Sequence, residues 1–410
     1  MVKVDTHQTG NTSLRALDAA NFLLADIRDG MGPYLAIYLL STLHWNAQNI
    51  GIAMSVMGIA TVIAQTPAGA LVDRTRRKRL FSILASLLIA LAALLTILWP
   101  RYGVIMGGQV IMGVAAAWFA PAVAALTLGL VGPRGFDGRV GRNETFNHAG
   151  NVFAALLAGL IGYYLKTEGI FVLLAVMSLL SSISIWRIRE ADIDHERARG
   201  CGPTDKQAKP GEKNAGIWAI LKNRSILFFA LACVLFHFAN AAMLPLLGQR
   251  LAKGINAGAS SAYMSACIIV AQLVMIPISH LTGRLAPKGR KRLLLIAFAV
   301  LPIRGFLYTL TNDPVLLIAI QILDGVGAGI FGVLAILIVA DLTAGSGLFN
   351  TTQGAIATAV GLGASLSNAF AGAVLQRTSY NTAFLTLAAI AIVALGVLWF
   401  FVPETSPEAR

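Results

Sequence analysis

Apolar runs of about 20 residues recur along the whole chain, and each is long enough to cross the hydrocarbon of a bilayer as an α-helix. Short polar stretches separate these runs. The pattern predicts twelve transmembrane helices. They cover residues 17–42, 49–72, 80–99, 102–131, 143–165, 169–188, 225–250, 258–281, 293–311, 314–341, 350–375 and 380–402. The expected fold class is therefore all-α integral membrane.

The longest polar segment, residues 187–224, divides these helices into two sets of six. Its mixture of charge with Gly, Pro and Lys is typical of a flexible linker. The halves also echo each other, because Gln109 and Gly113 are followed 212 positions later by Gln321 and Gly325. We expect two pseudo-symmetric six-helix bundles. The expected parts are an N-terminal bundle over 1–188, a cytoplasmic linker over 189–223 and a C-terminal bundle over 224–410.

Composition and charge agree with this pattern. Of the 410 residues, 57% are hydrophobic and only 12% are charged, which excludes an ordinary soluble globular protein. The net charge of +13 is confined to a few loops, with 22 cations in the predicted inner loops and five in the outer loops. Because cations stay on the cytoplasmic side, both termini are expected there. No basic face with interleaved aromatic residues accompanies the charge, so nucleic acid is not an expected partner.

Several kinds of site are missing from the sequence. The three cysteines, Cys201, Cys233 and Cys267, are too scattered for a disulfide framework or a CxxC metal site. No nucleotide fingerprint, HExxH motif or nucleophile-base constellation occurs, so neither an enzyme nor a bound cofactor is expected. Residues 1–15 lack the apolar core of a signal peptide, and the first helix is expected to act as the insertion signal. We expect a multi-pass protein of a bacterial-type inner (plasma) membrane.

A short stretch between the second and third predicted helices is densely charged. It reads Gly69-Ala-Leu-Val-Asp-Arg-Thr-Arg-Arg-Lys78, and a degraded copy lies at residues 283–292, where Pro287 takes the place of the Asp. The stretch resembles the signature loop between helices 2 and 3 of the major facilitator superfamily. The matching residues are Gly69, Asp73, Arg74, Arg77 and Lys78.

This resemblance covers nearly the whole chain and implies a secondary transporter. In that family two parallel six-helix halves enclose a solute site at mid-membrane, and alternating access needs no bound cofactor. For Asp73 the resemblance implies a conformational latch, in which its carboxylate meets the N-terminus of the helix that begins near Asn350. Free N–H groups and the helix dipole favour an anion there. The loop cations are expected to grip neighbouring helix ends.

Three ionisable residues cluster near the middle of the first predicted helix. Asp26 and Asp29 share a face of the helix, and Arg28 lies beside Asp29. Charges within a membrane helix are costly and are functional candidates by default. We expect Asp26 or Asp29 to exchange a proton, and Arg28 either to hold the carboxylate ionised or to receive an anionic group of a solute. The alternative is a buried ion pair that fixes this helix against a neighbour.

A polar stripe marks the start of the fifth predicted helix. Glu144, Asn147, His148 and Asn151 are spaced three and four apart and therefore share one face. The family resemblance implies that this helix lines the central cavity. We expect Glu144 in proton coupling and His148 and Asn151 in solute binding, or else a network at the end of the helix that ties loop cations to Glu144.

Polar residues also interrupt the apolar helices of the second half. His237 and Asn240 lie in the seventh helix and are candidates for solute binding, although a lone His in an apolar helix is commonly a packing residue. Arg304 and Asp324 lie at similar depth on either side of the turn at 311–314, so we expect them to form a buried structural ion pair. A cavity-facing Asp324 is the alternative.

The sequence therefore predicts a secondary active transporter for a small organic solute with a possible anionic group, such as a metabolite, siderophore or drug. We expect alternating access and coupling to protons. One alternative is a divalent metal-ion exporter that uses Asp26, Asp29, His148 or His237 as ligands. Another is a membrane sensor or scaffold that does not transport. The expected partners are the small-molecule solute, protons and the lipid bilayer, and the chain is expected to be a monomer.

Overall fold

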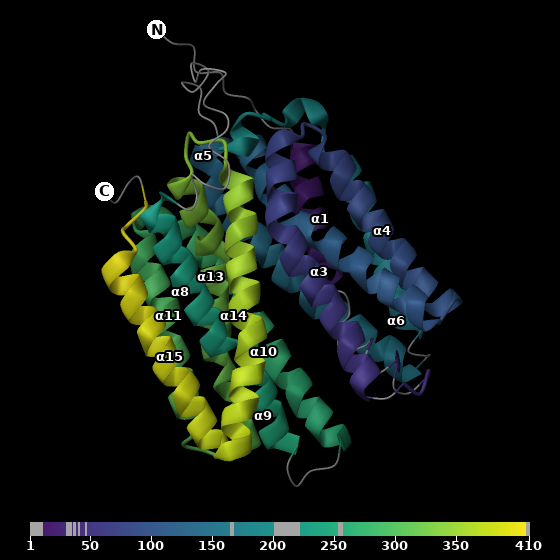
Figure 1. The fold of residues 1–410 in the computed structure, drawn as a ribbon. Helices are drawn as coiled ribbons and strands as arrows, with labels where there is room; N and C mark the ends of the chain where they lie inside the picture. The colour runs from purple at the N-terminus through teal and green to yellow at the C-terminus, as the bar shows by residue number, and fades with distance from the viewer. Residues whose placement is uncertain are drawn as a thin grey trace. The chain divides into compact units, whose positions relative to one another are not determined.

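A computed structural model provides the structure of this protein (Figure 1). It describes residues 11–29, 35, 38–39, 42–45, 47–164, 168–200, 222–252 and 257–406. The long helices are α1 (Asn11–Asp29), α3 (Ala47–Arg74), α4 (Lys78–Leu98), α5 (Tyr102–Tyr164), α6 (Glu168–Trp186), α8 (Arg224–Asn240), α9 (Met243–Ala252), α10 (Ala257–Leu285), α11 (Arg290–Leu307), α12 (Pro314–Ala319), α13 (Gln321–Leu342), α14 (Phe349–Arg377) and α15 (Tyr380–Phe401). Short 3-10 turns η1 (Glu190–Asp192), η2 (Arg197–Arg199) and η5 (Ala286–Lys288) join some of them. No strand occurs in these ranges.

The chain divides into two compact units. Unit 1 comprises residues 1–207 and 343–354, and unit 2 comprises residues 208–342 and 355–410. The first residues of α14 thus group with unit 1, and the rest of that helix groups with unit 2. The predicted boundaries of the linker at 189 and 223 stay predictions.

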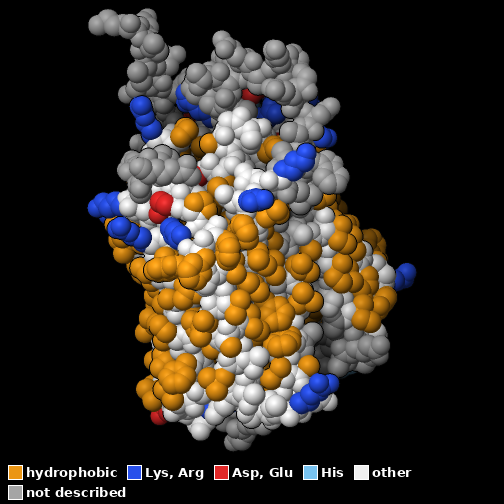
Figure 2. Space-filling model, turned by 60° about the vertical axis from the view of Figure 1, so that its left-hand side comes forward, with side chains coloured by type: hydrophobic (Ala, Val, Ile, Leu, Met, Phe, Trp, Pro, Cys, Tyr) orange, Lys and Arg blue, Asp and Glu red, His pale blue; other side chains and the backbone are white. Residues whose placement is uncertain are grey.

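The helices are built for a bilayer. Within the described ranges, nine helical segments are long and apolar enough to cross a membrane, and the segment Tyr102–Ala158 contains two of the predicted helices. The first and ninth predicted helices lie outside these nine segments. They correspond to α1, which carries five charged residues, and to α11, which begins with three cations. Figure 2 shows a broad band of hydrophobic side chains on one face, with most of the Lys and Arg gathered beyond one edge of the band. Exposed apolar residues of α15, including Ile392, Val393 and Phe400, contribute to such a surface.

Four predicted helices differ from the observed ones. The fourth and fifth predicted helices run together in α5 and are separated only by a kink at Gly132, whose φ of 65° lies in the left-handed region that glycine tolerates. The seventh is divided at residues 241–242 into α8 and α9, and the tenth is divided at Ile320 into α12 and α13. Hydropathy alone does not reveal such breaks, because the residues on both sides are apolar.

In unit 1, α3 and α1 pack on α5, and α4 packs between α5 and α6. In unit 2, α15 lies against α8 and α11, and α10 lies against α13 (Figure 1). Small residues permit the last contact, because a Cβ on Gly325 would lie 2.6 Å from the carbonyl oxygen of Ala271. The glycines of α13 therefore serve close helix packing, as expected for membrane helices. Phe236, Phe298 and Phe331 form an aromatic cluster in the core of unit 2.

Related contacts recur at one end of each unit. In unit 1, the Arg79 guanidinium at the start of α4 donates to the Trp186 carbonyl at the end of α6 and pairs with Glu190 at 2.9 Å. In unit 2, the Lys291 ammonium at the start of α11 donates to the Trp399 carbonyl near the end of α15. Glu404 accepts the backbone N–H groups of the first residues of α11. We call these helix ends, which carry the basic loops 74–79 and 284–292, the basic end of each unit.

Candidate functional site

The carboxylate of Asp73 receives four hydrogen bonds at the start of α14. One oxygen accepts the backbone and side-chain N–H groups of Asn350 at 3.2 and 2.8 Å, and the other accepts the backbone N–H and the hydroxyl of Thr351, both at 2.7 Å. Asp73 is only 4% exposed. The first N–H groups of a helix have no partner within it, and the helix dipole favours an anion there. The contact thus lies where the family resemblance implies it.

Other residues of unit 1 hold the same helix start. A Cβ on Gly69 would lie 2.0 Å from the Asn350 carbonyl oxygen, so only glycine allows α3 and α14 to approach this closely. The Asn350 amide also donates to the carbonyl of Ala198 at 3.0 Å. Phe349 is fully buried and packs edge-on against Phe136 of α5. The start of α14 is therefore fixed by side-chain, backbone and packing contacts together.

The loop cations divide into buried and exposed residues. Lys78 is 1% exposed and its ammonium donates to the Thr75 carbonyl at 2.7 Å, within its own loop. Arg74 and Arg77 are exposed. Arg79 was not among the predicted site residues, but its guanidinium binds the carbonyl of Trp186 at the end of α6. The residues that match the family loop end at Lys78. Arg79 is the next cation in the sequence, and this position was the available signal for its role.

Three helices of unit 2 bring polar side chains together in the membrane. Arg304 of α11 forms an ion pair with Asp324 of α13, and its other terminal nitrogen donates to the side-chain oxygen of Asn240 of α8. The Arg304 side chain is 3% exposed and that of Asp324 is 17% exposed. The predicted pair is thus present, and Asn240, selected for solute binding, joins it. We call Asn240, Arg304 and Asp324 the α11 polar cluster.

Helix ends position this cluster. Arg304 lies in the last turn of α11, Asp324 lies in the first turn of α13, and Asn240 is the last residue of α8. The dipole favours a cation at the C-terminal end of a helix and an anion at the N-terminal end. Both charges therefore occupy the helix end that stabilises them. Arg304 also lies over the Tyr308 ring at 5.9 Å, and the Tyr308 hydroxyl accepts from the Gln321 amide.

His237 lies one turn before Asn240 but makes different contacts. Its Nδ1 lies 3.1 Å from the Cys233 carbonyl of the same helix, and its ring packs edge-on against Phe236 and Phe331. These contacts are those of a packing histidine.

In unit 1 an unpredicted ion pair joins α1 to α5. Asp18 is 6% exposed and accepts from Arg139 at 2.7 Å and from Arg142 at 2.9 Å. Both arginines lie in the predicted loop 132–142. In the structure the helix resumes directly after Gly132 and contains both of them. A carboxylate in the first turns of a membrane helix was the available signal for Asp18. One turn further along α1, Asn21 is fully buried.

The polar stripe of α5 lies partly inside unit 1. The Asn147 amide donates to Glu144 at 3.3 Å, and His148 is 8% exposed. Two residues further along α5, a Cβ on Gly150 would lie 2.0 Å from the Phe22 carbonyl oxygen of α1. Asn151 is half-buried. The stripe thus adjoins the contact of α5 with α1, and within it Asn147 is linked to Glu144.

The charged set of the first predicted helix is described only in its backbone. Asp26, Arg28 and Asp29 belong to the last turns of α1, and their side chains lie outside the described residues. The roles predicted for these three residues stay predictions. In the part of the chain whose side chains are described, no group of three His, Cys, Asp or Glu residues is arranged to hold a metal ion.

The fold and these contacts define an integral membrane protein of two helical units with ion pairs buried in its helices. Residues 17–356 and 281–410 match the family model of the Major Facilitator Superfamily. The chain is 46% identical over 392 residues to uncharacterized MFS-type transporters from two strains of Mycobacterium tuberculosis, covering 95% of this chain and 93% of those proteins. The chain belongs to the Major Facilitator Superfamily.

Solved structures have the same fold at low sequence identity. The proton:xylose symporter XylE, bound to 6-bromo-6-deoxy-D-glucose, is similar with a TM-score of 0.76 and 14% identity, over 96% of each chain. The transporter FucP in its outward conformation is similar with a TM-score of 0.74 and 17% identity, over 94% of this chain and 98% of FucP. By its family, the chain is a multi-pass membrane transporter embedded in the lipid bilayer, and not an enzyme.

Proposed function

We propose that this protein is a secondary active transporter that moves a small organic solute by alternating access and couples this movement to protons. The observation that supports it best is the α11 polar cluster. Burying an ion pair in the membrane costs free energy, and a pair that merely stabilises packing is often replaceable by apolar residues. Intramembrane carboxylates are typical of proton routes.

The cluster has the chemistry of a proton switch. Protonation of Asp324 removes its charge and weakens the pair with Arg304, which then needs another anionic partner. The Arg304 Nε–H is a buried donor that can bind such a partner, because it has no hydrogen-bond acceptor in the described residues. A solute with a carboxylate or similar group supplies that partner. Binding of the solute and of the proton are thereby linked.

The predicted residues of unit 1 complete the proposal. Asp26, Asp29 and Glu144 are proposed to exchange protons, Arg28 to recognise an anionic group, and His148 and Asn151 to line the solute route. XylE is a proton:xylose symporter and FucP is the E. coli fucose:proton symporter, which supports coupling to protons here. The Asp73 contact is proposed to act as a latch that opens and closes during the transport cycle.

Transport by purified protein in lipid vesicles tests this proposal. A panel of organic acids, siderophores, cationic drugs, sugars and divalent metals is first compared by thermal stabilisation, because a ligand of the folded state raises its stability. Solutes that stabilise the wild type, but not Arg28→Ala, are then followed across the vesicle membrane with and without a pH gradient. We expect an organic anion whose movement depends on the gradient. Equal movement under both conditions contradicts proton coupling, and stabilisation by metals alone contradicts the solute class.

A further inference from the structure

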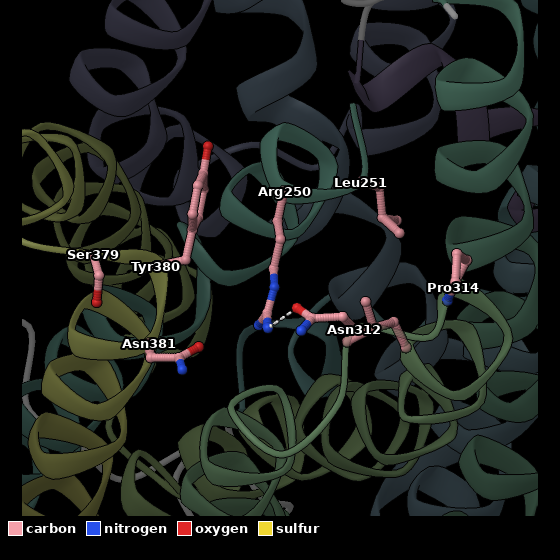
Figure 3. A pocket seen from close by; sticks show the side chains of 8 residues that line it. Arg250, Leu251, Asn312, Pro314, Ser379, Tyr380 and Asn381 are labelled. Atoms are coloured by element: carbon pink, nitrogen blue, oxygen red, sulfur yellow. Dashed lines mark hydrogen bonds between the residues drawn. The ribbon is translucent and has the colours of Figure 1, made fainter. Parts of the chain in front are cut away.

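A pocket of about 470 Å³ lies in unit 2 at the end opposite to its basic end (Figure 3). Three chain segments form it, namely the end of α9, the turn into α12 and the turn into α15. Its lining residues are Arg250, Leu251, Asn312, Pro314, Leu317, Ser379, Tyr380 and Asn381. The volume is in the range of small-molecule sites. The pocket contains none of the residues proposed above for transport.

One cation is held in place within this pocket. The two terminal nitrogens of Arg250 donate to the Tyr308 carbonyl and to the side-chain oxygen of Asn312, the latter bond being drawn in Figure 3. These two bonds use only two of the five N–H donors of a guanidinium. They orient the group without neutralising it, since neither acceptor carries a charge.

The rest of the lining mixes polar and apolar side chains, and none of these residues is acidic. Asn312, Asn381 and Ser379 are exposed and line the pocket together with Tyr380, and the Ser379 hydroxyl accepts the backbone N–H of Thr382 as the cap of α15. The nearby carboxylate of Asp313 is occupied by the backbone N–H groups of Val315 and Leu316 at the start of α12. The residues that line the pocket therefore carry one positive charge and several uncharged hydrogen-bonding groups, and the Asp313 carboxylate beside them keeps its negative charge.

We infer that this pocket binds a small organic anion that carries a carboxylate, with Arg250 as its charge partner. A planar guanidinium matches a carboxylate in geometry as well as in charge. The amides and hydroxyls suit further polar groups of the same molecule, and Leu251, Pro314 and Leu317 suit its carbon skeleton. A lipid phosphate is the competing occupant, and the lipid composition of the discs in the test below distinguishes it from a soluble carboxylate.

Tyr308 lies between the pocket and the α11 polar cluster and contacts one residue of each. Tyr308 accepts from Arg250 at its carbonyl, and its ring lies beside Arg304. Occupation of the pocket can thus affect the position of Tyr308 next to the buried pair. The binding inference itself does not depend on transport.

Protection of a local thiol from labelling tests the inference in the full-length protein. Asn381→Cys is introduced in a Cys201→Ser background, since the two remaining cysteines, Cys233 and Cys267, are buried. The purified protein in discs of zwitterionic lipid is labelled in the presence of acetate, succinate or benzoate, or of their amides. We expect at least one carboxylate to slow labelling about threefold or more, and its amide to have no effect.

Two variants and one control locate the binding. Arg250→Gln should abolish the protection. Ser379→Asp keeps a residue that can cap α15 but adds a negative charge, and it should weaken carboxylate binding about tenfold even if Arg250→Gln fails to fold. Arg377→Gln removes an exposed cation of the same turn that does not line the pocket, and it should keep the protection.

Four outcomes overturn the inference. They are no protection by any carboxylate, equal protection by the amides, protection that survives Ser379→Asp, and protection that appears only in discs containing phosphatidylglycerol. The last outcome would identify a lipid phosphate as the occupant.

Discussion

The Asp73 carboxylate accepts both the backbone N–H and the hydroxyl of Thr351, each at 2.7 Å, although the two residues are 278 positions apart in the sequence. The remaining residues of α14 after Gly354 belong to unit 2. Hydrogen bonds to a charged group are each worth about 1.5–3 kcal/mol, so this anchor matters energetically.

Asp73→Asn should weaken the anchor. An amide presents an NH₂ group to donors on α14, so at least one of the four bonds is lost, at a cost of about 1–3 kcal/mol. We expect the distribution of distances between spin labels at Tyr102 and Asn312 to change, as the protein leaves its latched state. Asp194→Asn, which removes another carboxylate that accepts backbone N–H groups, is the control. An unchanged distribution in Asp73→Asn would sink the latch.

Gly69→Ala should disturb the same helix start by a steric route. The added Cβ meets backbone atoms of Asn350, which cannot move aside as a flexible side chain can. We expect the thiol of a Thr352→Cys reporter, fully buried in the wild type, to be labelled about tenfold faster in the Gly69→Ala background. Gly58→Ala is the matched control, because its Cβ has nothing within 4 Å on the same helix. Equal labelling in both variants contradicts a tight contact.

Glu404 provides a prediction about pH. Burial raises the pKa of its carboxyl, but backbone N–H groups of Ser406, Arg290, Lys291 and Thr405 outweigh burial and hold the pKa below its ordinary value. A pKa lower in the folded than in the unfolded state stabilises the protein above the unfolded value, and this stability is lost as the pH falls through the folded one.

Glu404→Gln should therefore lower the unfolding temperature at pH 7, and the difference from wild type should shrink as the pH is taken below the ordinary glutamate value of about 4.3. Thermal unfolding of both proteins between pH 3.5 and about 7 measures it. Glu196→Gln, at a half-exposed carboxylate 3.7 Å from Arg76, controls for the loss of one negative charge. A difference that grows at low pH would contradict the sign of the shift.

The helices and the charged loop could be predicted from the sequence, but the breaks within the seventh and tenth predicted helices could not. Long apolar runs must form helices in lipid, so the existence of most helices followed from hydropathy. The breaks at residues 241–242 and at Ile320 depend on tertiary contacts, such as the Ala242 N–H that donates to Ser367 of α14 at 3.0 Å. The register of Asp18 against Arg139 likewise depends on where the helix resumes after Gly132.

Only part of the candidate site could be predicted, because the sequence gives the depth of a residue in its helix but not the neighbouring helix. Arg304 and Asp324 could be paired from depth alone, since helical rise fixes how far each lies from a shared turn. Depth says nothing about which helix lies beside them. The approach of Asn240 to Arg304, and the packing of His237 against Phe331, required the arrangement of helices in unit 2.

Asp29→Asn is expected to abolish pH-driven transport and to leave folding intact. An amide of the same size cannot exchange a proton; it keeps the shape of the side chain but replaces one acceptor oxygen with an NH₂ donor. Uptake into vesicles with an imposed pH gradient measures the first effect, and thermal unfolding measures the second. Asp192→Asn, in η1 rather than in a membrane helix, should transport normally. Wild-type uptake by Asp29→Asn would remove this residue from the coupling route.

The central claim is that a proton moves with the solute through the buried pair of Arg304 and Asp324. The most direct measurement is the change in internal pH of vesicles when a solute gradient alone is imposed. We predict a change for the wild type and for Asp341→Asn, which breaks the analogous Arg290–Asp341 pair at the basic end, and none for Asp324→Asn. A wild-type pH change in Asp324→Asn would contradict the role of the pair, and no change in the wild type would contradict proton coupling itself.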